Sequence, residues 1–405
     1  MNLDKKLLES KLDEIALVIK QDFKMQKDVG VLDGLSGLAI FAFEYGKFKN
    51  DETFFDIGGD ILTVCMDRVN KGYGLPTFCT GIAGFFWTLL HLEQHSFIAL
   101  DLDEILDPMD DFLFSCMQAD LEKKDYDYLH GALGYGMYFL KRYENCEVKK
   151  KGIYLDKLHV LALSVYSMAE KSNGFLRWRS KLRHDSDQTG FNLSLSHGMA
   201  SIVNFFVRLA SITELSDISE KIYNGASSFI LSSRNNGNAD SIFPSWVLSD
   251  NSQSSESRIG WCYGDFGIGV TLLQLWEKNN DQDLKVFTKS LFSNCIRRTQ
   301  EITPDINDAG FCHGSFGIAY IYHLLDHVNN LDIDATSVIE KWVAKGLELA
   351  CFDDGPAGFK QFHPNYGNPK YVNQLNLLEG ISGIGLVLID ILSTKKGNWS
   401  ESLLL

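Results

Sequence analysis

Proline and long apolar runs are both scarce in this sequence. Only seven prolines occur among its 405 residues, so helices can run through much of the chain without interruption. No stretch of about 18 uncharged apolar residues occurs, which argues against a membrane-spanning helix. The first residues lack the uninterrupted apolar core of a secretion signal, and we therefore expect a cytoplasmic protein.

Positive charge is also in short supply. The chain has 38 basic residues against 53 acidic ones, which gives a formal net charge of -15. A nucleic-acid-binding surface needs a broad basic face that displaces counterions, so no nucleic-acid partner is expected.

The eight cysteines do not form a disulfide pattern. They are scattered along a long chain without a secretion signal, so reduced thiols or metal ligands are the expected states. The cysteines are Cys65, Cys79, Cys116, Cys146, Cys262, Cys295, Cys312 and Cys351.

A short glycine-containing phrase recurs seven times. Each copy has two or three mostly apolar residues, one variable residue, a Gly-x-x-Gly or a close variant, and then an apolar run. Successive copies lie 47 to 67 residues apart, which leaves room for two helices and their loops. The first glycines of the copies are Gly34, Gly81, Gly131, Gly198, Gly264, Gly314 and Gly380.

The segments that follow the phrases differ from those between them. IAGFFWTLLHL and FGIAYIYHLLDH are apolar on all sides, whereas LDKLHVLALSVYSMAEK has ordinary amphipathic patterning. Helices of the first kind belong inside a protein, and helices of the second kind belong at its surface. We therefore predict an all-α fold, an α/α toroid (double α-barrel) with seven inner helices, formed by residues 1–405 as a single domain. Residues 1–30 are predicted to be an amphipathic helical segment packed on the barrel.

Two polar stretches, residues 172–190 and 248–258, are predicted to be inserted loops. The first contains four basic residues around Trp178. It is either a solvated loop or a docking site for an acidic peptide. The basic residues are Arg177, Arg179, Lys181 and Arg183.

One column of the aligned copies is polar although it precedes apolar helices. Equivalent repeat positions of a closed toroid form a ring, so this column predicts a ring of polar groups at one end of the barrel. The residues are Asp33, Thr80, His130, His197, Tyr263, His313 and Glu379.

The preceding column has cysteine in two neighbouring copies. Cys262 in the fifth copy and Cys312 in the sixth are predicted to lie near each other, with His313 beside the latter. Two thiolates and an imidazole suit Zn²⁺ and leave a fourth coordination position open for water or substrate. Alternatively, both cysteines are buried as small apolar residues. Cys79 shares the column but has no such neighbours, so we expect it to be structural.

Histidine, carboxylate and arginine residues near the same end are candidates for acid–base chemistry. His197 and His130 share one column, although a single core histidine is usually structural. Asp127 lies four residues before Gly131 and can equally well cap the helix that follows. Arg258 either holds a surface carboxylate or stabilises negative charge in the site.

These residues resemble those of the lanthipeptide cyclase family, the lanthionine synthetase C-like proteins. The similarity rests on WCYG (261–264), FCHG (311–314), LSHG (195–198), DYLHG (127–131) and glycine phrases such as GISG. It covers about residues 30–390. The paired CYG and CHG phrases, in this order and at this spacing, are its most specific part.

The resemblance implies a double α-barrel that contains a zinc site and acid–base groups. The residues that match functional positions of the family are the ligands Cys262, Cys312 and His313, the acid–base residues Asp127 and His197, and the site-lining residues Arg258 and Tyr263. Two positions depart from the family pattern. CYG is followed by DFG, where the family often has a proline, and His130 stands where the family often has glutamate.

The resemblance also implies an activity. A lanthipeptide (lantibiotic) cyclase adds the cysteine thiols of a dehydrated precursor peptide to dehydroalanine or dehydrobutyrine. This Michael-type addition forms the thioether rings of lanthionine and methyllanthionine. Dehydration needs a separate dehydratase, because this chain has no Walker-type phosphate loop or kinase signature. A peptide transporter is a further candidate partner.

Other functions fit parts of the sequence. A thiol- or glutathione-binding member of the same family would hold a thiol without cyclising a peptide. An α/α-toroid glycosidase needs two carboxylates, for which Asp33, Asp127, Asp265 and Glu379 are available, but it leaves the two cysteines of the repeat unexplained. A helical scaffold without activity is the remaining alternative.

Overall fold

The structure, a computed structural model, describes residues 3–182, 187–235, 237, 239–248, 252, 256–301, 306–328, 331, 333–363 and 370–405. The chain divides into two compact units. The first consists of Met1–Leu102 and Asp305–Leu403, and the second of Asp103–Pro304 with Leu404–Leu405. Among the described helices, none combines the length and the apolar character that crossing a membrane requires.

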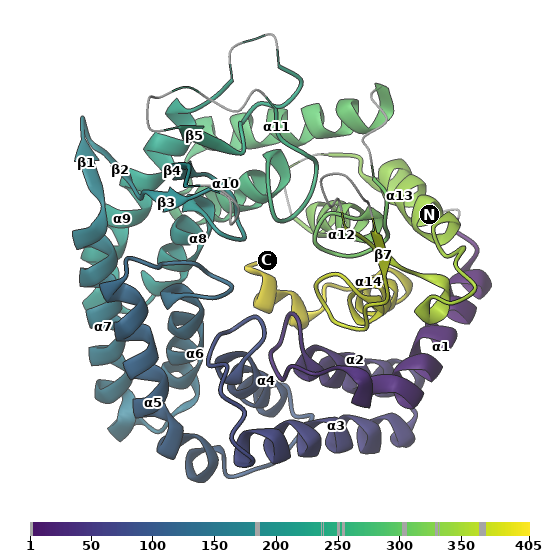
Figure 1. The fold of residues 1–405 in the computed structure, drawn as a ribbon. Helices are drawn as coiled ribbons and strands as arrows, with labels where there is room; N and C mark the ends of the chain where they lie inside the picture. Colours follow the sequence, from purple (N-terminus) through teal and green to yellow (C-terminus); the bar gives the residue numbers. More distant parts are fainter. Residues whose placement is uncertain are drawn as a thin grey trace. The chain divides into compact units, whose positions relative to one another are not determined.

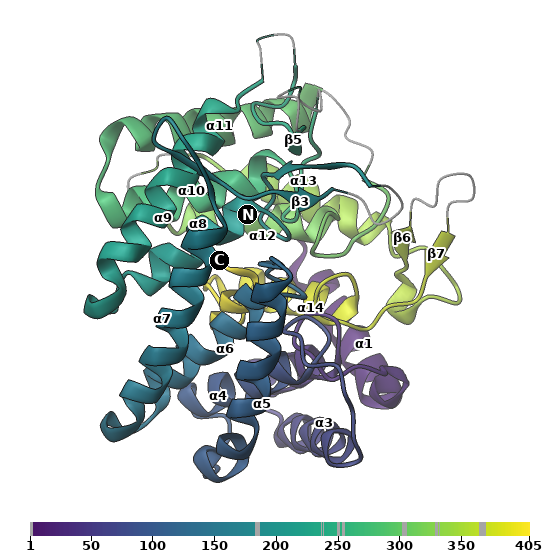
Figure 2. The ribbon, with the colours of Figure 1, turned by 60° about the vertical axis from the view of Figure 1, so that its left-hand side comes forward.

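Helices dominate both units (Figure 1). The α-helices of the first unit are α1 (Lys5–Asp22), α2 (Leu35–Lys49), α3 (Glu52–Asn70), α4 (Ile82–Gln94), α12 (Ser315–Asp326), α13 (Thr336–Glu348) and α14 (Ile381–Ser393). Its short elements are the 3₁₀-helices η1 (Phe23–Met25), η3 (Pro356–Gly358) and η4 (Asn398–Leu403), and the antiparallel strands β6 (Gln361–His363) and β7 (Lys370–Val372), which Figure 2 shows as a pair.

The second unit has the same alternation of helices. Its α-helices are α5 (Leu102–Glu122), α6 (Ala132–Asn145), α7 (Lys151–Met168), α8 (Met199–Leu209), α9 (Thr213–Ser232), α10 (Asp265–Asn279) and α11 (Gln282–Glu301). Its short elements are η2 (Val148–Lys150) and the strands β1 (Glu170–Ser172), β2 (Phe175–Arg177), β3 (Ser180–Lys181), β4 (Thr189–Asn192) and β5 (Trp246–Leu248).

Two kinds of helix alternate along the chain, as the hydrophobic patterns predict. Every residue of α4 from Ile82 to Leu92 is buried, so this helix has no solvent-facing side over that length. The preceding helix, α3, buries one face only, with Phe54, Ile57 and Ile61 among its buried residues. Within each unit an inner helix packs on the outer helix that follows it, as α2 does on α3 and α8 on α9.

The seven glycine phrases begin the seven inner helices. The first glycine of each copy is the residue that precedes the first helical residue of α2, α4, α6, α8, α10, α12 or α14. The predicted boundary between the loop and the inner helix is therefore confirmed in all seven copies.

A common loop geometry explains why the phrase recurs. The first helical residue of α2, α4, α6, α12 and α14 donates its N–H to the carbonyl of the residue seven positions earlier, as in Ile82 to Leu75 at 3.0 Å and Ala132 to Asp125 at 3.1 Å. The loop thus folds back onto the helix that it precedes. At the second glycine of the phrase, a Cβ atom added to Gly84 would overlap the carbonyl oxygen of Phe78. The small residue is required because the backbone itself occupies the space.

Replacing Gly84 by alanine is expected to lower the free energy of unfolding by about 1–3 kcal/mol, because a backbone carbonyl cannot move aside as a side chain can. Gly59→Ala is the matched control. Gly59 lies in α3 with no atom within 4 Å of an added Cβ, so alanine there should raise the free energy of unfolding by up to about 1 kcal/mol. Denaturant unfolding followed by circular dichroism measures both, and equal effects at the two sites would contradict the close approach.

The segment 172–190 contains short strands rather than loop alone. Asn173 and Gly174 both have positive φ, and they connect β1 to β2 with Ser172 paired to Phe175. An Asn-Gly pair between two extended runs is a typical two-residue hairpin turn. Residues 183–186 of this segment, and residues 249–251 and 253–255 of the second predicted loop, lie outside the described residues.

The two described arginines of this segment are already paired. Arg177 and Arg179 both pair with Glu170, and the guanidinium group of Arg177 also lies over the ring of Phe191. Trp178 is buried and donates its indole N–H to the carbonyl of Val165 at 2.8 Å. The hypothesis of a docking site for an acidic peptide therefore has no support from these residues, while Arg183 lies outside the described residues.

Candidate metal and acid–base site

Backbone hydrogen bonds join the loops of neighbouring copies at one repeat position. In the first unit, Cys312 donates its N–H to Leu378 at 2.8 Å, Leu378 to Leu32 at 2.9 Å, and Leu32 to Cys79 at 3.1 Å. All four residues belong to the column that lies two positions before the first glycine. Residues that share this column of the sequence alignment are therefore hydrogen-bonded neighbours in the first unit.

The same position holds Cys262 in the second unit. Its carbonyl oxygen accepts hydrogen bonds from the N–H groups of Leu195 and Ser196, at 3.2 and 3.3 Å, and from the Ser196 hydroxyl at 3.2 Å. His197 and Tyr263, the residues that follow in the two loops, are brought together as a result. Their ring centroids lie 6.3 Å apart.

Asp127 and His197 form a close hydrogen-bonded pair. Asp127 Oδ2 lies 2.6 Å from His197 Nδ1, while Asp127 Oδ1 accepts the N–H groups of Leu129 and His130 at 2.7 and 2.8 Å. Asp127 therefore acts as a cap and also contacts the histidine. One of its oxygens caps the turn before α6, and the other orients the imidazole of His197. With Nδ1 held by the carboxylate, Nε2 is the nitrogen that His197 can offer to another group.

The pair shifts the pKa of each member in opposite directions. Burial by itself would lower the pKa of His197, but the charge of Asp127 and its hydrogen bond outweigh burial and raise it. Burial would likewise raise the pKa of Asp127, but His197 and the His130 backbone N–H lower it. His197 consequently keeps its proton to a higher pH than an ordinary histidine does.

Aromatic residues surround this pair. Tyr263 accepts a hydrogen bond from Asn192 Nδ2 at 3.2 Å, and the ring of Trp246 stands edge-on to it at 6.4 Å. Burial raises the pKa of Tyr263, so its hydroxyl stays protonated at neutral pH and can donate. The exposed ring of His130 lies nearly parallel to that of His197, with centroids 6.3 Å apart.

Arg258 is an exposed residue at the start of the fifth loop. Its carbonyl oxygen lies where a Cβ on Gly264 would have to be, and Gly264 has a φ of 90°, which favours glycine. Among the described residues, its side chain has no hydrogen bond or ion pair that connects it with His197. A role of Arg258 in charge stabilisation therefore stays a prediction.

The departure from the family pattern at DFG has a structural role. Asp265 is fully buried and accepts the N–H groups of Ile242 and Phe243 at 3.0 and 2.8 Å, and Arg298 donates to it at 2.9 Å. A carboxylate held in this way anchors the segment before β5. It is not available as a glycosidase acid or base.

His313 is next to a carboxylate in the first unit. Its Nε2 lies 3.5 Å from Asp308 Oδ2, and the two Asp308 oxygens also accept the N–H groups of Gly310 and Phe362, both at 3.1 Å. A carboxylate beside a ring nitrogen is the usual way in which a metal-binding histidine is oriented.

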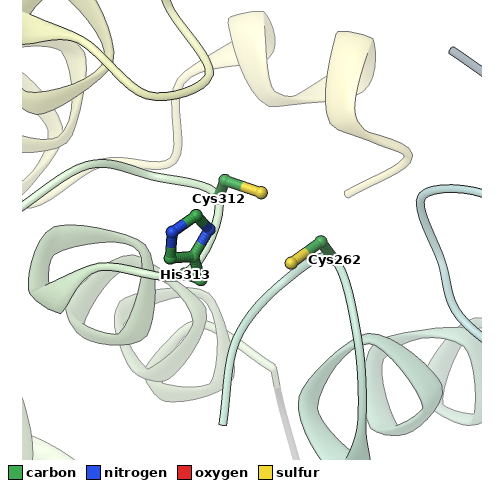
Figure 3. Close-up of side chains that lie close together, drawn as sticks. All are labelled: Cys262, Cys312 and His313. Atoms are coloured by element: carbon green, nitrogen blue, oxygen red, sulfur yellow. The ribbon is translucent and has the colours of Figure 1, made fainter. Parts of the chain in front are cut away.

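The predicted metal ligands come together in the structure. One ligand atom from each of Cys262, Cys312 and His313 lies within 4.8 Å of the others (Figure 3). In a tetrahedral zinc site, bonds of about 2.3 Å to sulfur and about 2.0 Å to nitrogen place the ligand atoms about 3.5–3.8 Å apart. The donor set fits Zn²⁺ in chemistry and number.

A further carboxylate occupies the polar column of the first unit. Burial raises the pKa of Glu379 to about 7, and the nearby carboxylates Asp33 and Asp308 act in the same direction, while His313 and a hydrogen bond from Gln361 oppose them. The Glu379 N–H is held by Asn376 Oδ1 at 2.8 Å.

Sequence reasoning missed Asp308, Asn192, Asn376 and Gln361. Two further columns could have revealed the first three. Asp308 and Asn192 both lie six residues before a first glycine, and Asn376 lies four before one, at the position of Asp127. Gln361 lies outside the repeated phrase, so no column contains it.

Comparison with known proteins gives the family. The family model for lanthionine synthetase C-like proteins matches residues 26–404. This chain belongs to the lanthionine synthetase C-like family. No curated protein sequence matches it significantly.

Solved structures of similar shape give the fold of this family member. The structure of nisin cyclase matches with a TM-score of 0.73 over 98% of both chains, at 18% sequence identity. The predicted fold class, an all-α α/α toroid, is thereby confirmed. The Lin0763 protein from Listeria innocua matches with a TM-score of 0.44 at 10% identity, over 88% of this chain and 84% of that one, and supports no argument.

Asp127→Asn is expected to lower the pKa of His197, because the neutral amide removes the charge that outweighs burial. Titration of the imidazole Cε1–H resonance by NMR measures this, with the other histidine signals of the same sample as the internal control. An unchanged pKa in the variant would show that Asp127 does not set the protonation of His197.

Proposed function

We propose that this member of the lanthionine synthetase C-like family is a zinc-dependent lanthipeptide cyclase. The observation that carries the proposal is the three-donor group Cys262, Cys312 and His313. Two sulfurs and one nitrogen complete three of the four positions of a tetrahedral zinc, which is typical of catalytic rather than structural sites.

Zinc bound by these residues would supply an open position at which a peptide thiol loses its proton near neutral pH. The substrate is a dehydrated precursor peptide. Its thiolate sulfur forms a bond to the β-carbon of a dehydroalanine or dehydrobutyrine. The π electrons of the Cα–Cβ double bond move toward the amide carbonyl, so that an enolate develops.

His197 is the residue best placed to complete the addition. Its raised pKa favours the protonated imidazole, and the Asp127 pair leaves Nε2 as the nitrogen from which a proton can pass to the α-carbon. Asp127 fixes the orientation of the ring. The protonated hydroxyl of Tyr263, next to His197, can stabilise negative charge on the carbonyl oxygen, and Arg258 is a candidate for the same role.

Cys312→Ala or Cys262→Ala should abolish zinc binding and cyclisation together, because two remaining ligands do not hold the metal tightly. Metal analysis gives the zinc content. Mass spectrometry after thiol alkylation gives cyclisation, since ring closure alone causes no mass change. Cys79→Ala is the matched control, because Cys79 occupies the same repeat position outside the three-donor group. A purified sample that is free of metal and still cyclises would refute the proposal.

His197→Ala should retain zinc but lose turnover by about 10²–10⁴-fold, because the proton donor is removed while the ligands stay in place. His327→Ala, at an exposed position after α12, serves as the control. Turnover close to wild type in His197→Ala would remove this residue from the acid–base role.

The same assay separates cyclisation from thiol binding. A thiol- or glutathione-binding family member would bind zinc and the peptide thiol but leave every cysteine of a dehydrated peptide open to alkylation. Protection of those cysteines in a wild-type reaction supports the cyclase.

A further inference from the structure

Four aromatic rings follow one another across the acid–base loops of the second unit. The ring centroids of Trp246 and Tyr263 lie 6.4 Å apart. Those of Tyr263 and His197 are separated by 6.3 Å, and those of His197 and His130 also by 6.3 Å. We call these four residues the aromatic row. His130 is exposed and the other three are partly exposed, so each ring has surface that a ligand can contact from solvent.

The packing of three inner helices fixes the order of the row. Helix α8 contacts both α6 and α10, so it lies between them in this unit (Figure 1). His130, His197 and Tyr263 each precede the first glycine of these helices, in the order α6, α8 and α10. His197 is therefore in the middle of the three, and Trp246 extends the row beyond Tyr263.

The β4–β5 pairing holds the Trp246 end of the row in place. Val247 is buried, while Trp246 and Leu248 on either side of it belong to the opposite, partly exposed face of β5. Asn192 is the partner of Trp246 in the strand register, and its side chain also donates a hydrogen bond to the Tyr263 hydroxyl at 3.2 Å. A ring that is held in position before a ligand arrives loses little freedom on binding.

The spacing of the rings fits an extended peptide. Alternate side chains of an extended chain point to the same side and recur about every 6.6 Å. The three distances within the aromatic row, 6.3 to 6.4 Å, are close to this repeat. A peptide that follows the row can therefore place every second side chain against a ring. Aromatic rings offer a large apolar contact area, so the row favours apolar and aromatic side chains over charged ones.

The row runs through the residue proposed to protonate the substrate. A peptide whose dehydro residue lies at His197 passes His130 on one side, and Tyr263 and then Trp246 on the other. At one ring for every second residue, a side chain two residues from the dehydro residue contacts His130. On the other side, a side chain within four residues contacts Trp246.

We propose that the aromatic row binds the extended segment of the precursor peptide around the reacting dehydro residue, and that Trp246 and His130 select apolar or aromatic side chains at its two ends. The inference rests on the proposed cyclase function. In it, His130 is a flat binding surface and takes no part in acid–base chemistry. Since the family often has glutamate at this position, the His130 end of the row distinguishes this chain from those relatives.

The first test measures binding without turnover. Labelled peptides carry one dehydroalanine, no cysteine, and a phenylalanine or an alanine at each of the four positions on either side. With wild type, phenylalanine at one position on one side should lower the Kd about tenfold relative to alanine, because it is buried against the indole. Trp246→Ala should reduce this gain to less than twofold, whereas Trp246→Phe should keep most of it.

Phe112→Ala is the matched control, because Phe112 is a 41% exposed aromatic residue in α5 of the same unit. It should keep the full gain. The inference would be overturned if phenylalanine gave no gain with wild type at any position, or if the gain were the same with wild type and Trp246→Ala.

The second test separates binding from acid–base chemistry at the other end of the row. His130→Phe retains a flat ring but cannot carry a proton, so its KM and kcat should stay within about twofold of wild type. His130→Ala removes the ring and should raise KM about tenfold. A loss of kcat in His130→Phe as large as that in His130→Ala would make this residue an acid–base group and refute its place in the row.

The cysteine-free peptides keep these outcomes distinct from failure of the proposed function. If wild type shows the gain from phenylalanine but leaves a dehydrated, cysteine-containing peptide uncyclised, the cyclase proposal fails while the row still binds peptide. If wild type cyclises normally and Trp246 makes no difference to the gain, the aromatic row alone is refuted as a binding surface.

Discussion

The hydrogen bond that folds a loop back onto its inner helix, at α2, α4, α6, α12 and α14, is the constraint on which the rest depends. The chain passes so close to the helix that Gly84, Gly317 and Gly383 have no room for a side chain. Once this turn is fixed, the two residues before the first glycine take the same position in every copy. The backbone bonds from Cys312 to Leu378 and from Leu378 to Leu32 then follow.

A repeated loop gives the protein a set of equivalent positions to which different chemistry can be attached. The first and seventh copies have leucine at the position of Cys312. There Leu32 and Leu378 contribute backbone hydrogen bonds only. In the second, fifth and sixth copies the same position carries a thiol, and the thiols of the fifth and sixth copies belong to the three-donor group. The site is therefore specialised by side chains, while the glycines and the backbone bonds of the loops are shared.

Asp127 shows how structural and chemical roles combine in one side chain. One oxygen holds the N–H groups of Leu129 and His130, which fixes the carboxylate without a further partner. The other oxygen is then directed at His197, and the charge of the pair outweighs the cost of burying the imidazole. Rigid positioning by the loop removes the entropy cost of orienting the pair.

The sequence by itself determined the helix order, the start of each inner helix and the candidate ligands, because a repeated glycine phrase places equivalent residues in equivalent turns. It also contained the Asn173–Gly174 hairpin turn, within a segment that reads as a polar loop. Only the tertiary structure decided which side chains meet. The Asn192–Tyr263, Asp308–Phe362 and Gln361–Glu379 contacts depend on packing between distant segments, and local patterns in a sequence do not encode the distances between them.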